Sequence, residues 1–124
     1  MNKKLLFVYN ADSALFNQLG DFIHKIISPK TYPCNLCSLT YSGASMRKDW
    51  KEFVNLLPLK NEFLHKDEFF KLFPKKQNIT LPAVFLQLNN DMIEFISAKE
   101  INHAKTLEEL KLLVQQNLAR ANYE

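Results

Sequence analysis

Residues 5–9 form a run of consecutive apolar or aromatic side chains, and this run constrains the fold more than any other stretch of the chain. An apolar run of this length, ended here by Asn10 and Asp12, is typical of a β-strand buried on both faces of its sheet. Such a strand requires helices on both sides of the sheet. We therefore predict an α/β fold in which residues 4–9 form a central strand.

Alternating strand and helix signals follow this first strand. A helix with a broad apolar face is expected over residues 15–27, capped by Asp12 or Ser13 and stopped before Pro29. Residues 35–41 are rich in β-forming side chains and predict a second strand. Ser45 is expected to cap a second helix that reaches residue 57. A short third strand over 61–65 and a short helix over 67–73 come next.

The last third of the chain has the clearest pattern. Residues 83–88 and 92–97 predict two antiparallel strands, because Asn89 and Asn90 tolerate the left-handed conformation of a tight hairpin. Thr106, with Glu109 three residues later, predicts the start of a final amphipathic helix. The order is therefore β-α-β-α-β-α-β-β-α, a mixed sheet flanked by helices.

Length and charge limit the classes of protein that fit. The chain has 124 residues and only two glycines, so we expect a single domain over residues 1–124. Sixteen basic and thirteen acidic residues give a net charge of +3 with no basic stripe, which argues against nucleic acid as a partner. No apolar run approaches the ~18 residues of a membrane span, and no signal peptide is apparent. We expect a cytoplasmic protein with no membrane partner.

The predicted order, with Leu81-Pro82 leading into the first hairpin strand, resembles the thioredoxin-like fold. The sequence marker of this resemblance is the segment from Thr80 to Phe85. The resemblance implies a cis-proline at Pro82 and an α/β domain covering nearly the whole chain. In that fold a reactive Cys-x-x-Cys follows a strand and opens a helix, where unpaired backbone N–H groups favour the thiolate.

A second resemblance involves the segment H-K-x-x-S-P-x-T-Y-x-C-x-L-C-x-L-T-Y, which spans residues 24–41. It looks like a family of small uncharacterised bacterial proteins. This resemblance brings no known activity with it.

Cys34 and Cys37 are the two cysteines of the chain and have Cys-x-x-Cys spacing. They are candidates for thiol–disulfide chemistry, but Pro33 before them and the β-forming Thr40 and Tyr41 after them predict a strand rather than a helix. The chain then has no cysteine at the position after a strand where the thioredoxin-like fold carries its reactive pair. We therefore expect a non-catalytic binding or accessory role in preference to an enzyme, with a thiol–disulfide oxidoreductase as the alternative.

Metal binding is a further reading of the cysteine pair. Two thiolates at this spacing can share one Zn²⁺, and His24 is the best third ligand that the sequence offers. The alternative is that Cys34 and Cys37 pack as small apolar groups, with no cofactor. The sequence alone leaves both readings open.

A small-ligand site is also expected where the strands end, because ligands of open α/β sheets bind beyond the carboxyl ends of the strands. We expect this site at the opposite end of the sheet from the cysteines. His65 could transfer a proton there, whereas the neighbouring acids could equally be helix caps. The candidate residues are Asn10, Asp12, Ser13, Tyr41, His65, Asp67 and Pro82.

Phe69, Phe70 and Phe73 bring several large apolar groups into one short helix. They could form a homodimer contact or, as we prefer, close over the core. The sequence names no substrate and no protein partner.

Overall fold

The computed structural model describes residues 3–13, 34–42, 45–76, 78–89 and 91–123. In these residues the chain forms a mixed α/β structure with a four-stranded sheet, a separate two-stranded ladder and five α-helices. The elements are β1 (Lys3–Val8), α3 (Asn35–Thr40), β2 (Tyr41–Ser42), β3 (Ser45–Met46), α4 (Lys48–Asn55), β4 (Lys60–Leu64), α5 (Lys66–Leu72), the 3₁₀ turn η1 (Pro74–Lys76), β5 (Ala83–Leu88), β6 (Asp91–Ile96), α6 (Ala98–His103) and α7 (Leu107–Arg120).

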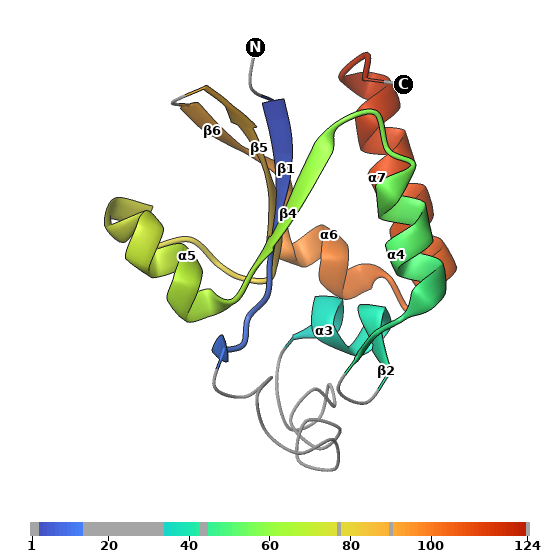
Figure 1. The fold of residues 1–124 in the computed structure, drawn as a ribbon, viewed down its shortest axis with the longest axis horizontal. Helices are drawn as coiled ribbons and strands as arrows, with labels where there is room; N and C mark the ends of the chain where they lie inside the picture. Colours follow the sequence, from blue (N-terminus) through green and yellow to red (C-terminus); the bar gives the residue numbers. More distant parts are fainter. Residues whose placement is uncertain (1–2, 14–33, 43–44, 77, 90, 124) are drawn as a thin grey trace.

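The four-stranded sheet has the order β4-β1-β5-β6 (Figure 1). Strand β1 is parallel to β4 and antiparallel to β5, and β5 is antiparallel to β6. The prediction of a central strand over residues 4–9 is therefore confirmed. The predicted hairpin is confirmed as well, and Asn89 has the expected positive φ of 57°. The Leu81–Pro82 peptide bond is cis.

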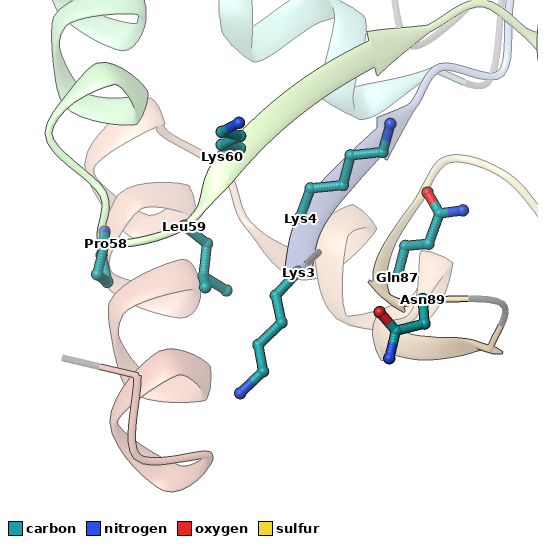
Figure 2. Close-up of a pocket in the computed structure, with 7 residues that line it drawn as sticks. All are labelled: Lys3, Lys4, Pro58, Leu59, Lys60, Gln87 and Asn89. Atoms are coloured by element: carbon teal, nitrogen blue, oxygen red, sulfur yellow. The ribbon is translucent and has the colours of Figure 1, made fainter. Parts of the chain in front are cut away.

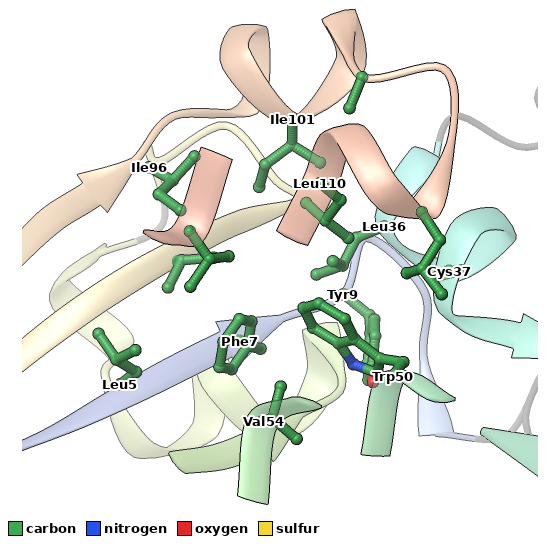
Figure 3. Close-up of a cluster of buried hydrophobic side chains, with 14 of the residues drawn as sticks. Leu5, Phe7, Tyr9, Leu36, Cys37, Trp50, Val54, Ile96, Ile101 and Leu110 are labelled. Atoms are coloured by element: carbon green, nitrogen blue, oxygen red, sulfur yellow. The ribbon is translucent and has the colours of Figure 1, made fainter. Parts of the chain in front are cut away.

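The two faces of the sheet carry separate hydrophobic cores. Leu5, Phe7 and Tyr9 point to the face covered by α3, α4, α6 and α7, where Phe7 meets Trp50 edge-on at 5.6 Å between ring centroids (Figure 3). Leu6 and Val8 point to the opposite face, which α5 covers. Alternate residues of β1 thus enter different cores, which explains why its sequence is apolar without interruption.

The prediction of a second strand over residues 35–41 is wrong, because residues 35–40 form helix α3. Its buried side chains, Leu36, Cys37 and Thr40, share one face at helical spacing. The Thr40 hydroxyl donates to the Leu36 carbonyl one turn earlier, at 2.6 Å. Burial on one side has therefore outweighed the β propensity of the segment, and extended structure begins only at Tyr41.

Three further differences concern helix starts. Ser45 lies in β3 rather than capping a helix, and α4 begins after Arg47 without a side-chain cap. Helix α6 was not predicted. Thr106 does cap α7, as expected. The helix expected over residues 15–27 lies outside the described residues.

No helix in the described ranges is both long and apolar enough to cross a membrane.

Candidate functional site

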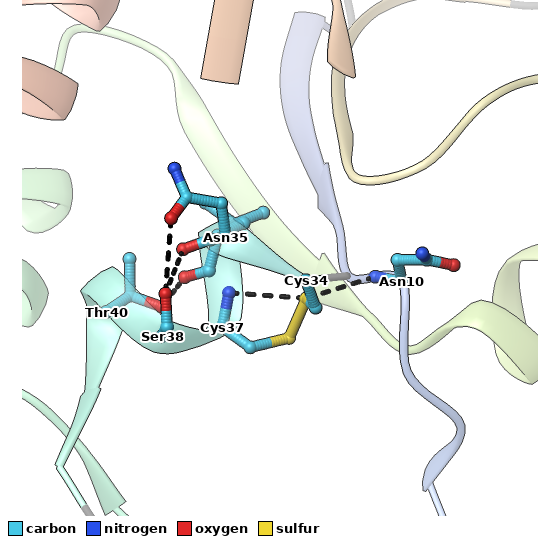
Figure 4. Close-up of a disulfide and its surroundings, with 7 residues drawn as sticks. Asn10, Cys34, Asn35, Cys37, Ser38 and Thr40 are labelled. Carbon is cyan, nitrogen blue, oxygen red and sulfur yellow. Dashed lines mark hydrogen bonds between the residues drawn. A yellow bond between two sulfur atoms is a disulfide. The ribbon is translucent and has the colours of Figure 1, made fainter. Parts of the chain in front are cut away.

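Cys34 and Cys37 are joined by a disulfide within the first turn of α3 (Figure 4). Cys34 is the N-cap residue of the helix, and Cys37 lies one turn later. Both side chains have 0% exposure and belong to the larger core. The pair therefore opens a helix, which corrects the expectation that it precedes or begins a strand.

The sulfur of Cys34 accepts two backbone hydrogen bonds. One comes from the N–H of Asn10, just beyond the end of β1, and the other from the N–H of Cys37, both at 3.3 Å. Hydrogen bonds to the charged form of a thiol favour the thiolate, whereas burial in an apolar core disfavours it. The two N–H donors therefore give the Cys34 sulfur a polar contact on each side within an otherwise apolar core.

Helix α3 is attached to the rest of the molecule through Asn35, which lies between the cysteines. Its side-chain Nδ2 donates to the carbonyl oxygens of Ile101, at 2.8 Å, and Ala104, at 2.7 Å. Ser38 Oγ donates in turn to the Asn35 carbonyl at 3.0 Å. The turn that holds the disulfide is thus bonded both to itself and to the end of α6.

The carboxyl ends of β1 and β4 lie side by side at this end of the sheet. The Lys66 N–H donates to the Ala11 carbonyl at 2.9 Å, and the Ser13 N–H donates to Asp67 Oδ1 at 2.8 Å. Burial opposes the ionisation of Asp67, but the hydrogen bonds from Ser13 and the backbone outweigh it and lower the pKa of this carboxyl. The segment after β1 is therefore held against the start of α5.

His65 caps α5 immediately after β4. Its Nδ1 lies 2.6 Å from Glu68 Oε1, and the same carboxylate oxygen accepts the His65 N–H at 2.8 Å. The bond from the backbone of His65 is the largest effect on Glu68 and lowers the pKa of its carboxyl. His65 therefore has a cap role that accounts for its position without any catalysis.

Tyr9 connects these groups at the end of β1. Its ring lies 5.7 Å from the ring of His65 and 5.7 Å, edge-on, from the ring of Tyr41. Burial raises the pKa of Tyr9 well above its ordinary value of 10.0, and burial also raises the pKa of Tyr41. Both phenols are therefore proton donors and acceptors in neutral form at physiological pH.

The residues predicted for a ligand site lie at the end of the sheet where β1 and β4 terminate. Pro82 is at this end too, because Ala83 pairs with Val8 in the antiparallel register. The expectation that His65 lies far from the cysteines is wrong, since Asn10 bonds to Cys34 at this same end. Asp12 is exposed.

Among the described residues, no group of three or more His, Cys, Asp or Glu side chains is placed to hold a metal ion. His24 lies outside the described residues. A zinc site that used Cys34 and Cys37 would bind their thiolates, so it would require the reduced pair. Zinc therefore stays a prediction.

A surface cavity of about 620 Å³ lies at the other end of the sheet (Figure 2). Two of the three lysines that line it have partners: Lys4 is 2.6 Å from Glu62, and the Lys3 ammonium lies 5.0 Å from the centroid of the Tyr123 ring. Its lining residues are Lys3, Lys4, Pro58, Leu59, Lys60, Gln87 and Asn89.

Sequence reasoning missed Asn35 and Tyr9. No local pattern identifies Asn35, because its partners are more than 60 positions away. Tyr9 could be recognised only as a strand residue. Comparison of the chain with family models, curated proteins and solved structures finds no match.

Proposed function

We propose that this chain is a thiol–disulfide redox protein whose reversible couple is Cys34 and Cys37. The observation that carries the proposal is the environment of Cys34, whose sulfur accepts N–H bonds from Asn10 and from Cys37. The preference for a non-catalytic role depended on a strand at residues 35–41. Because that segment is helix α3, the alternative becomes the better supported reading.

The arrangement of the sheet supports this proposal. Parallel β1 and β4, with the antiparallel β5 and β6 beyond β1, agree with the resemblance to the thioredoxin-like fold. In that fold a Cys-x-x-Cys opens a helix after a strand. Cys34 likewise opens α3 and bonds to Asn10 at the end of β1.

The reaction is an exchange with a second disulfide, such as oxidised glutathione. The Cys34 thiolate attacks one sulfur of that disulfide, forms a mixed disulfide and releases one thiolate. The Cys37 thiolate then attacks Cys34 Sγ and releases the second. Two protein thiols are oxidised, one reagent disulfide is reduced, and the two protons lost by the protein pass to the released thiolates.

Burial determines the kinetics of this exchange. Both cysteines have 0% exposure, so a reagent can reach Cys34 only after the parts of the protein that cover its sulfur move away. We expect exchange to be slower than with an exposed thiol, without a change in the equilibrium itself.

The test is an equilibrium titration in glutathione buffers of graded reduced-to-oxidised ratio, followed by acid quench, thiol alkylation and intact mass. The proposal predicts a reversible transition between a dithiol and a form lighter by about two mass units before alkylation. Cys34→Ser and Cys37→Ser are matched controls, and neither can form the internal disulfide.

Two outcomes would overturn the proposal. The pair could stay in one state at every ratio while the protein remains folded. Alternatively, native mass spectrometry of the reduced protein could show one zinc per chain that Cys34→Ser abolishes, which would favour the metal reading.

A further inference from the structure

We propose that Asn35 couples the redox state of the cysteine pair to the junction between α6 and α7. This inference rests on the proposed redox function and adds a mode of regulation to it. The junction comprises Ala104, Lys105 and Thr106, which connect the end of α6 to the cap of α7.

The Asn35 amide binds carbonyl oxygens at the end of α6. The last carbonyls of a helix have no partner within the helix and must be satisfied from elsewhere. The Asn35 side chain donates to the carbonyl of Ala104, the C-cap residue of α6, and to that of Ile101, which also accepts the Ala104 N–H at 3.1 Å. A primary amide has two N–H donors and can make both bonds. Asn35 therefore acts as a cap supplied to α6 by another helix.

The cap supplied by Asn35 lies close to the start of α7. Ile101 is fully buried and Ala104 nearly so, which fixes the end of α6 in the larger core. Two residues later, Thr106 is the N-cap of α7. Its hydroxyl accepts the Glu109 N–H at 3.1 Å, and the Glu109 carboxylate accepts the Lys105 N–H at 2.8 Å. A displacement at Ala104 therefore reaches the first turn of α7 directly.

Reduction of the disulfide changes the space that the two sulfur atoms occupy. Two thiols need more room than a disulfide, because non-bonded sulfur atoms must move apart. Cys34 and Cys37 are completely buried in a core that is filled by other side chains, so the room must come from the first turn of α3. Asn35 lies within that turn, and its two bonds to α6 weaken when the turn moves.

Linkage makes this coupling reciprocal. If the Asn35 bonds are stronger in the disulfide form, they must favour that form at equilibrium. Removing them then makes the pair easier to reduce. A purely structural role for Asn35 would lower stability in both redox states equally and would leave the midpoint unchanged.

The experiment combines the glutathione titration with amide hydrogen exchange. We expect Asn35→Ala to shift the glutathione equilibrium toward the dithiol by about fivefold, the equivalent of one net hydrogen bond. The matched control is Asn61→Ala, which removes an amide bond to another helix-end carbonyl, that of Val54, outside α3 and α6. It should leave the equilibrium unchanged.

Hydrogen exchange compares the oxidised and reduced forms of the protein directly. Reduction should accelerate exchange at Ala104 and in the first turn of α7 by about fivefold, and Asn35→Ala should remove this dependence on redox state. Equal exchange in the oxidised and reduced wild type would overturn the coupling. So would an Asn35→Ala midpoint equal to that of Asn61→Ala. A wild type without a reversible couple would instead refute the proposed function.

Discussion

Tyr9 is the residue at which the central strand meets the candidate site. It is 1% exposed, and its ring contacts both His65 and Tyr41. Burial and the neighbouring Tyr41 raise the pKa of its phenol well above 10.0. In the unfolded chain the same phenol ionises near its ordinary value, so the folded protein binds a proton that the unfolded chain releases at high pH.

This difference predicts a specific alkaline instability. Above about pH 10 the ionisation of Tyr9 stabilises the unfolded state. The free energy of unfolding therefore falls by up to about 1.4 kcal/mol per pH unit because of this group. Tyr9→Phe lacks the phenol and should show a flatter pH profile above that value. Urea unfolding from about pH 8 to about pH 11 measures the difference.

Tyr123→Phe is the control for this experiment, because it removes a phenol that is half-buried near the end of the chain. Its profile should follow the wild type more closely than that of Tyr9→Phe does. Identical profiles for Tyr9→Phe and the wild type would show that Tyr9 ionises alike in both states.

At the scale of elements, α3 and α6 show what a local pattern can and cannot predict. The segment of α3 contains Thr40, which favours a strand, and its helix is stabilised by contacts with distant elements such as α6. Such contacts are invisible in a local window. Helix α6, by contrast, carries a readable signal, because Ser97 and Glu100 form a capping box.

The cap of α6 gives a prediction at this scale. Ser97 Oγ accepts the Glu100 N–H at 3.2 Å, and the Glu100 carboxylate accepts the Ser97 N–H at 3.1 Å. Ser97→Ala should lower the free energy of unfolding by about 1 kcal/mol. Chemical denaturation at neutral pH measures this loss.

Ser45→Ala provides the matched comparison. The sequence pattern suggests that Ser45 caps a helix, whereas the structure places it, exposed, in β3. The substitution should therefore change stability by less than about 0.5 kcal/mol. A loss as large as that of Ser97→Ala would mean that Ser45 does begin α4.

At the scale of the whole molecule, the phenylalanine-rich helix closes a core. Phe69 is fully buried, and its ring stacks on that of Phe85 at 5.2 Å between centroids. Phe70 and Phe73 are partly buried against the same cluster. This supports the preferred reading of these residues, while the homodimer stays a prediction.

The sheet and most of its strands could be predicted because their apolar pattern is strong, as in β1 and in the β5–β6 hairpin. The candidate site could be predicted only in part. A strand at residues 35–41, parallel to β1, would have put the cysteines at the amino end of the sheet, away from His65. This one wrong element assigned the candidate residues to two opposite ends of the sheet, and Asn35 and Tyr9 were not among them.

Cys34 begins α3 beside the end of β1, where its sulfur accepts the Asn10 N–H, and we propose that it changes redox state together with Cys37. The most direct test is an NMR comparison of the oxidised and reduced protein, observing the Asn10 amide. We predict a nuclear Overhauser contact between this amide and the Cys34 β-protons, and a reversible shift of the amide resonance on reduction. A missing contact together with an unchanged Asn10 resonance in the two states would contradict the claim.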